Sequence, residues 1–253
     1  MKVDKDIDPS EQTTRYFLSN NERTIIMNKE NFFLMVDRKY SAYYDHLNPS
    51  KPTLEEFIPL LLWIYINCLG WQGTDYGTYR GTLKEMALGL GYGGENSAQF
   101  QRLRKALQAI QKEGLITDQT YGTPIESGKI RPTDFLMIQF NKVAFAGSKN
   151  FVMAKDRTIK KFFEAKTVMM ERNTVVKLIN FWFAMSCTVY GNKGKPCSHK
   201  RLRKTLGKSD TTLHACYHIL HEMGLFSRKQ IFNADNNRQW IYYAEWAMPE
   251  ESE

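Results

Sequence analysis

One stretch near residue 100 is rich in side chains that form hydrogen bonds of fixed geometry. The polar face predicted for it carries amides and cations: Gln99, Gln101, Arg102, Arg104, Lys105 and Gln108. A glutamine amide can bond an adenine edge through two atoms, and a guanidinium can bond a guanine edge in the same way. These residue types therefore suit recognition of base pairs in double-stranded DNA. The plainer alternative is a solvated helix face, because Arg, Lys and Gln are also good helix formers.

A second group of candidates lies further along the chain, where cations cluster without an acid among them. They are Lys200, Arg201, Arg203, Lys204 and Lys208. The helix predicted to follow them presents short polar side chains: Ser209, Thr211, Thr212 and His214. Cations next to phosphates set affinity and its salt dependence, whereas sequence is read at the base edges. Further phosphate candidates lie in two predicted hairpins: Lys129, Arg131, Arg228, Lys229 and Arg238.

Metal binding and catalysis have weaker support. His214, His218 and His221 share a helical face, but no Glu follows His214 as the zinc-peptidase motif requires. We therefore expect a polar recognition face without a metal or cofactor. The cysteines (Cys68, Cys187, Cys197 and Cys216) show no paired spacing and are expected to be free thiols.

Several catalytic signatures are missing from the sequence. It contains no glycine-rich phosphate loop ending in Lys-Ser/Thr, no Gly-x-Ser-x-Gly elbow and no His-x-His pair. We expect a protein that is not an enzyme.

The elements that must position the first group follow from apolar spacing. Phe100, Leu103, Leu107 and Ile110 recur at helical intervals, with Ser97 at the expected N-cap and a glycine at 114 ending the helix. A short helix from residue 82 and a glycine-rich turn precede it, after a loop at residues 70–81. Turn formers at residues 120–132 and a strand at residues 135–140 predict a hairpin after it.

This order of elements resembles the winged helix-turn-helix family. The resemblance implies that the second helix of the pair enters the DNA major groove and that the hairpin, or wing, lies against the phosphate backbone. It also implies that the apolar residues 31–37 form a strand that pairs with the wing.

The second half of the chain repeats the pattern of the first. Leu103, Ile110 and Gly114 match Leu213, Leu220 and Gly224 at a constant offset, and a long apolar helix precedes each set. We expect a mainly helical α+β protein with two tandem winged helix-turn-helix domains, each with a small hairpin wing. The predicted parts are a flexible N-terminal arm (1–30), a first domain (31–141), a linker (142–172), a second domain (173–247) and an acidic tail (248–253).

Composition limits the remaining possibilities. The chain has 253 residues, a hydrophobic fraction of 42% and a formal net charge of +8, which favours an anionic partner. No apolar run reaches the ~18–20 residues that span a bilayer, and no signal peptide is visible, so we expect a cytoplasmic location without membrane contact.

Tandem winged helices resemble the architecture of plasmid replication initiators and of regulators carried by mobile elements. The resemblance implies a sequence-specific partner of double-stranded DNA, with a site of about two helical turns. A homodimer is compatible with the aromatic long helices. The alternative is a winged-helix protein–protein adaptor in a replication or conjugation complex.

Overall fold

Two long apolar helices, α1 (Phe57–Leu69) and α5 (Thr174–Thr188), pack against each other at the centre of the molecule. The computed structural model describes residues 14–16, 25–27, 33–47, 50–69, 77–93, 96–141, 150–164, 174–188, 195–196, 199–232 and 238–244. Phe57, Leu61 and Ile64 on α1, and Ile179 and Phe183 on α5, have no more than 1% of their surface exposed. They belong to one continuous core that extends through both halves of the chain.

The first half places a helix pair and a small sheet beside α1. The elements are β4 (Thr78–Thr82), α2 (Leu83–Gly89), α3 (Ser97–Lys112), β5 (Ile116–Asp118) and β6 (Phe135–Phe140). The antiparallel sheet has the order β4-β6-β5, so the predicted hairpin is confirmed. The loop predicted at residues 70–81 was wrong in its last part, because β4 lies there and pairs with β6.

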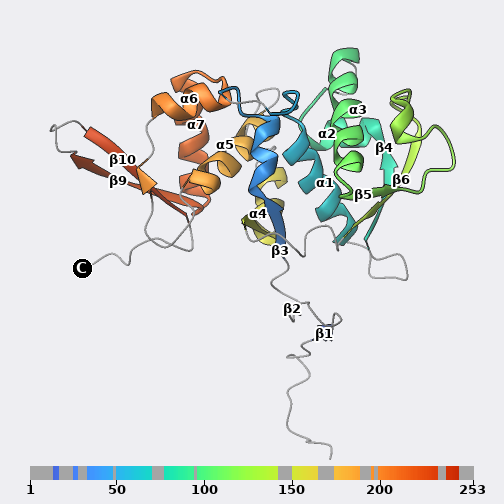
Figure 1. The fold of residues 1–253 in the computed structure, drawn as a ribbon, viewed down its shortest axis with the longest axis horizontal. Coiled ribbons are helices and arrows are strands. Elements are labelled where there is room, and N and C mark those ends of the chain that lie inside the picture. Colours follow the sequence, from blue (N-terminus) through green and yellow to red (C-terminus); the bar gives the residue numbers. More distant parts are fainter. Residues whose placement is uncertain are drawn as a thin grey trace, which may run out of the picture.

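The second half repeats this order beside α5. It comprises β8 (Lys195–Pro196), α6 (His199–Leu206), α7 (Asp210–Glu222), β9 (Phe226–Phe232) and β10 (Arg238–Ala244). Its sheet has the equivalent order β8-β10-β9, with the short first strand against the last. The two hairpins lie at opposite ends of the long axis, with α1 and α5 between them (Figure 1).

Equivalent glycines end the second helix of each pair. Gly114 and Gly224 have φ values of 71° and 70°, a conformation that glycine adopts without the strain a Cβ would cause. The next amide, at Leu115 or Leu225, donates to the carbonyl five residues back, at 3.2 and 2.8 Å. The constant spacing noted in the sequence therefore corresponds to the same helix ending in both halves.

The segment between the halves is packed against both of them. β7 (Phe151–Lys155) leads into α4 (Asp156–Glu164), which contacts α1 and α5. Phe163 meets the Trp63 ring edge-on at 5.1 Å, and Phe162 lies 5.3 Å from the Trp182 ring. Consecutive phenylalanines on α4 thus join the long helix of one half to that of the other.

The strand predicted at residues 31–37 exists, but its predicted partner was wrong. β3 (Phe33–Asp37) pairs antiparallel with β7, whereas the wing strand β6 pairs with β4. β3 continues into a 3-10 helix, η2 (Arg38–Tyr43), whose Tyr43 ring stacks on Phe57 at 4.0 Å. The short apolar run at residues 33–36 indicated a strand, but a partner more than a hundred residues away leaves no local signal.

The fold is α+β, with helices and small antiparallel sheets. Within the predicted N-terminal arm, β1 (Thr14–Tyr16) pairs with β2 (Ile25–Met27). The acidic tail lies outside the described residues. In the part of the chain that the structure describes, none of the helices has both the length and the apolar character needed to cross a membrane.

Candidate nucleic-acid interface

Helix α3 presents a narrower polar face than its sequence predicted. Ser97, Gln101, Arg102 and Lys105 are exposed, and Arg104 and Gln108 are half-buried. The prediction that Gln99 is exposed was wrong, because only 8% of its surface is accessible. Gln99 lies on the same side of the helix as the buried Leu103, Ala106 and Ile110. Because Ala106 is buried too, the buried side of α3 is wider than the stripe of large apolar residues, and it includes Gln99.

The cap of α3 was predicted one residue too late. Asn96 is the N-cap, and its side-chain oxygen accepts from the Ala98 amide at 2.9 Å. Ser97 is therefore the first helical residue. Its side chain lines the groove described next.

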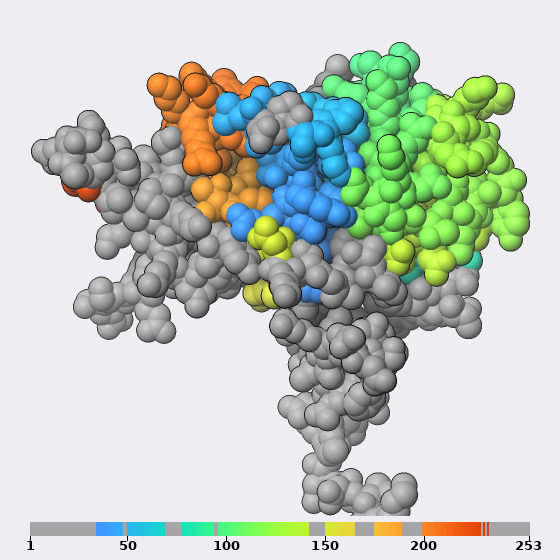
Figure 2. All heavy atoms as spheres, viewed as in Figure 1, coloured from blue at the N-terminus to red at the C-terminus, as the bar shows by residue number. Residues whose placement is uncertain are grey.

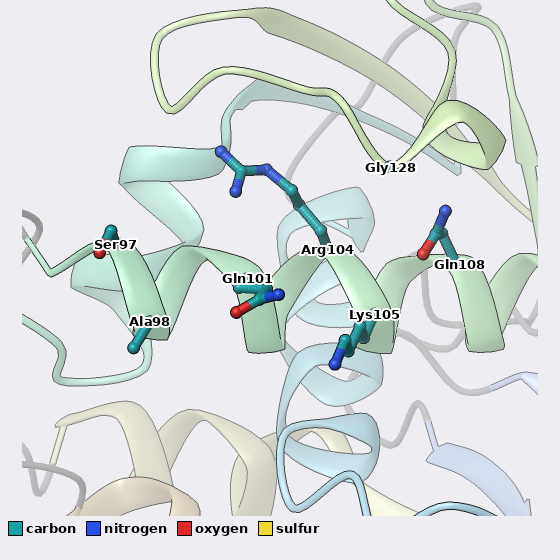
Figure 3. A pocket seen from close by; sticks show the side chains of 7 residues that line it. All are labelled: Ser97, Ala98, Gln101, Arg104, Lys105, Gln108 and Gly128. Atoms are coloured by element: carbon teal, nitrogen blue, oxygen red, sulfur yellow. The ribbon is translucent and has the colours of Figure 1, made fainter.

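Two side chains of α3 hold the segment between β5 and β6 against the helix. Arg104 Nε donates to the Ile130 carbonyl at 2.5 Å, and Gln108 Nε2 donates to the Glu126 carbonyl at 2.8 Å. In Figure 3 both side chains point toward the segment that contains Gly128, whereas Lys105 points away from it. Gly128 has a φ of +64°, and a Cβ there would lie 3.0 Å from Gln108 Nε2. A side chain at this position would therefore crowd the contact.

An open groove of about 490 Å³ lies between α3 and this segment. Its lining is polar and small-residue-rich, and consists of Ser97, Ala98, Gln101, Arg104, Lys105, Gln108 and Gly128. The groove offers amide and cationic groups on one side and loop backbone on the other, which suits a polar, anionic ligand.

The segment between β5 and β6 is fixed by two aspartates that were not among the predicted site residues. Asp118 accepts from the Thr120 and Ile125 amides at 3.0 and 2.7 Å, and Asp134 accepts from the Arg131 amide at 2.8 Å. Their signal was available, because Asp commonly bonds backbone amides a few residues away in turns. The ordered turn leaves the Lys129 and Arg131 side chains exposed.

Arg102, predicted as a DNA-binding residue, makes a contact within the molecule. Its Nε lies 3.0 Å from Glu56 Oε1, and its guanidinium lies over the Tyr92 ring at 5.8 Å. The Tyr92 hydroxyl donates to the same carboxylate oxygen at 2.7 Å. Burial and the Glu56 charge raise the pKa of Tyr92, so the hydroxyl keeps its proton and remains a donor.

In the second half the cations are concentrated on α6. Lys200, Arg201, Arg203 and Lys204 are all exposed. Arg203 pairs with Asp210 at 3.2 Å across the turn between α6 and α7. The remaining cation, Lys208, is half-buried and pairs with Glu55 at 2.7 Å.

The outward face of α7 carries Thr211 and His214, as predicted, while Thr212 is half-buried. Ser209 is the N-cap and accepts from the Thr212 amide at 3.3 Å. The His214 ring lies 4.5 Å from His199 on α6. Burial, together with the nearby His214 and Arg228, lowers the pKa of His199.

Arg228 lies over the Tyr217 ring at 4.1 Å, so it packs against α7 rather than extending into solvent. Lys229 and Arg238 belong to the paired strands β9 and β10, and their side chains lie outside the described part. Among the described residues, His, Cys, Asp and Glu form no cluster of three or more able to hold a metal ion. The three described cysteines, Cys68, Cys187 and Cys216, are free thiols.

Both helix pairs reach the molecular surface. In the space-filling view α3 and the segment after β5 form the right side of the visible face, and α6 forms its upper left (Figure 2). Comparisons with known proteins found no matching family model, no matching curated protein and no matching solved structure.

Proposed function

We propose that the chain is a sequence-specific double-stranded DNA-binding protein built from two winged helix-turn-helix units. The observation that carries the proposal is the repeated order of helix, strand, helix pair and hairpin with equivalent sheet orders. In such units the second helix of each pair enters the major groove and the hairpin lies beside it. α3 and α7 hold those places here.

In the first unit, α3 reads base pairs through Gln101 and Lys105. Both are exposed and line the groove, whereas Arg104 and Gln108 are engaged with the wing. A glutamine amide selects adenine by two hydrogen bonds, at about 1–3 kcal/mol of discrimination. Lys129 and Arg131 on the wing contact phosphates on either side of that groove.

In the second unit, α6 supplies phosphate contacts and α7 supplies short side chains to the bases. Exposed cations on α6 and the exposed Thr211 and His214 on α7 support this division. The two units together cover about two helical turns, ~20 base pairs.

The biological setting that we propose is a mobile element. The protein acts there either at a plasmid replication origin or at a promoter or transfer site. Both roles need the same interface, and the arrangement of target sites separates them: repeated sites indicate an origin, and a single site over a promoter indicates regulation.

A footprint on DNA from the neighbourhood of the protein's own gene tests the proposal. Wild-type protein should protect a discrete segment of ~20 base pairs at moderate salt. The Gln101→Ala, Lys105→Ala variant should lose protection at one end, and the Lys200→Ala, Lys204→Ala variant should weaken protection at the other. Lys160→Ala, an exposed lysine on α4 outside both helix pairs, is the matched control and should footprint as wild type does.

A protein–protein adaptor is the second candidate, and one surface favours it. Tyr121 and Phe135 on the first wing are 96% and 57% exposed, and with Met137 they line an apolar hollow. Exposed apolar groups of this kind mark interaction sites. Absence of any protected segment, together with salt-insensitive binding to a protein that Tyr121→Ala abolishes, would place the adaptor first.

A further inference from the structure

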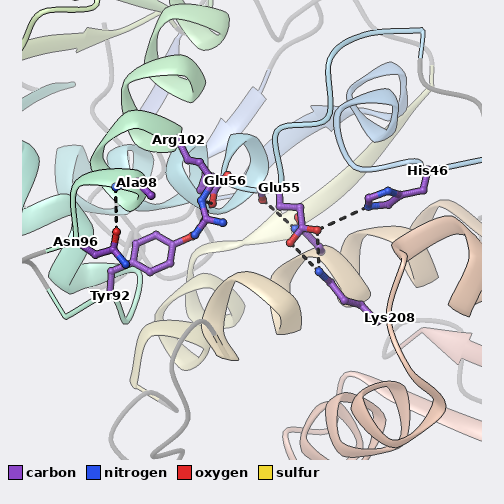
Figure 4. A network of polar contacts seen from close by, with 9 residues as sticks. His46, Glu55, Glu56, Tyr92, Asn96, Ala98, Arg102 and Lys208 are labelled. Atoms are coloured by element: carbon purple, nitrogen blue, oxygen red, sulfur yellow. Dashed lines mark hydrogen bonds and ion pairs between the residues drawn. The ribbon is translucent and has the colours of Figure 1, made fainter.

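The residues just before α1 connect the two helix pairs through adjacent carboxylates. Glu55 reaches the second half and Glu56 reaches the first (Figure 4). Both lie in the turn that precedes Phe57, the first residue of the central helix. Their positions relative to each other are therefore set by a few backbone bonds and by the buried helix that follows.

Glu56 is bound on the side of the first helix pair. Its side chain is only 4% exposed; it forms an ion pair with Arg102 on α3 and accepts a hydrogen bond from Tyr92 in the turn between α2 and α3. A carboxylate this deeply buried requires partners, because removing a charge from water costs several kcal/mol. The contact thus fixes α3 relative to the start of α1.

Glu55 is bound on the side of the second helix pair. Lys208, in the turn between α6 and α7, donates to both of its oxygens at 2.7 and 2.9 Å. Asn180 on α5 donates to the Glu55 carbonyl at 2.8 Å, so the backbone is held as well as the side chain. His46 adds a backbone bond to the Thr205 carbonyl at 2.9 Å, at the end of α6.

The two contacts face each other across a cleft of about 300 Å³ between the halves. It is lined by Thr53, Glu55, Glu56, Tyr92, Arg102, Val176, Lys177 and Lys208. Two of the three cations that line the cleft, Arg102 and Lys208, are thereby paired with acids of the same molecule. Arg102 and Lys208 thus connect the two helix pairs to adjacent residues at the start of α1.

We propose that Glu55 and Glu56 are positioning residues that set the spacing between the two DNA half-sites the protein accepts. This inference rests on the proposed function, because it requires both helix pairs to bind DNA. With α3 and α7 held to one point, inserting a base pair between half-sites turns one of them by about a tenth of a helical turn. The pairs Glu55–Lys208 and Glu56–Arg102 together form what we call the clamp. A protein whose helix pairs are held by the clamp cannot follow that rotation.

The first test needs no DNA. Spin labels at Lys112 and Glu222, exposed equivalent positions in the last turns of α3 and α7, report the distance between the helices by electron double resonance. The labels are introduced through unnatural amino acids, because the chain contains four cysteines. Wild type should give one narrow distance distribution, and Glu55→Gln with Glu56→Gln should broaden it.

Two further variants separate the clamp from general loss of packing. Glu113→Gln is the matched control: Glu113 is also partly buried and paired, but with Lys51, Lys39 and Tyr43, away from α6 and α7. It should leave the distribution narrow. The exchange Glu55→Lys with Lys208→Glu should restore the narrow distribution that Glu55→Lys alone loses.

The second test uses the footprinted DNA with its central spacer lengthened or shortened one base pair at a time. Wild type should lose at least about tenfold in affinity for each change, and the double glutamine variant should bind the series within a few-fold of its best member. Narrow distances in all variants, or the wild-type spacer preference in the double variant, would overturn the clamp while leaving DNA binding intact. Failure of wild type to bind any discrete site would overturn the proposed function and the clamp with it.

Discussion

The helix pairs α2–α3 and α6–α7 share one topology but carry their polar groups differently. On α3 the exposed face combines amides and cations, and the wing adds Lys129 and Arg131. On α7 the exposed face carries Thr211 and His214, and the exposed cations lie on the preceding helix α6. Under the proposed function, the base-reading helix of the first half carries its own cations, whereas the second half places its cations on the helix before the base-reading one.

In both helix pairs, several cationic side chains are bound by other groups of the same molecule. Of the α3 guanidinium groups, Arg102 is held by Glu56 and Arg104 by the Ile130 carbonyl. In the second half, Lys208 is held by Glu55. Counting cations along a helix therefore overstates how many can meet a ligand, since the fold uses several of them to position its own parts.

The largest expected effect concerns the core that the halves share. Leu103→Ala and Leu213→Ala remove equivalent buried side chains, 0% and 1% exposed, and each should lower the free energy of unfolding by about 2–5 kcal/mol. Because the core is continuous, each variant should shift a single transition for the whole molecule. Urea denaturation followed by circular dichroism measures this, and Lys160→Ala should change little. Two separate transitions, only one of which moves, would contradict a shared core.

Residues proposed to contact phosphates and residues proposed to contact bases should differ in their effects on the salt dependence and the sequence discrimination of DNA binding. Lys200→Ala with Lys204→Ala should weaken binding to all sequences alike and reduce the slope of log K against log salt by about 2, roughly one for each phosphate contact. Gln101→Ala should leave that slope unchanged and lower discrimination at one base pair by about 1–3 kcal/mol. Fluorescence anisotropy over a salt series on matched and single-substituted sites measures both. Equal slopes in the two variants would remove the distinction between the helix pairs.

A smaller effect is expected where α3 holds its wing. Arg104→Met and Gln108→Met each remove one hydrogen bond to the wing segment, worth about 1 kcal/mol, and should weaken DNA binding by displacing Lys129 and Arg131. The loss should largely disappear when Lys129 and Arg131 are already alanine. A double-mutant cycle measures this coupling. Additive losses would mean that Arg104 and Gln108 contact DNA directly.

The smallest effect is a difference in pH response. The pKa of His199 in the folded protein lies below its ordinary value of 6.5, so the unfolded chain takes up that proton first and stability falls as pH drops from 6.5 through the folded value. For Glu113, hydrogen bonds from Lys51 and Tyr43 outweigh the effect of burial and lower the pKa from 4.5, so its contribution is lost only at more acidic pH. The denaturation midpoint of wild type should therefore fall more than that of His199→Gln as the pH drops below 6.5. Parallel midpoints over that range would contradict the assignment.

The sequence predicted the elements whose signals are local. The apolar stripe from Phe100 to Ile110 is buried as expected, and so are its matching positions Leu213 and Leu220 in the second half. The glycines at 114 and 224 end their helices. These features follow from spacing and backbone freedom, which neighbouring residues determine.

The parts that the sequence did not predict depend on partners distant along the chain. β3 pairs with β7, and Glu55 reaches Lys208 across 153 positions. Glutamate residues before a helix have an ordinary explanation in the helix dipole, so nothing in their spacing indicated a clamp. The prediction for Gln99 was wrong because it rested on the polarity of the side chain and did not count Ala106 among the buried residues of α3.

The central claim is that two unlike helix pairs read one extended DNA site. Selection from a random double-stranded library by wild-type protein tests it most directly. The account predicts a bipartite motif spanning ~20 base pairs, in which Gln101→Ala relaxes one base position in one half only. Enrichment of no motif at moderate salt would contradict the account.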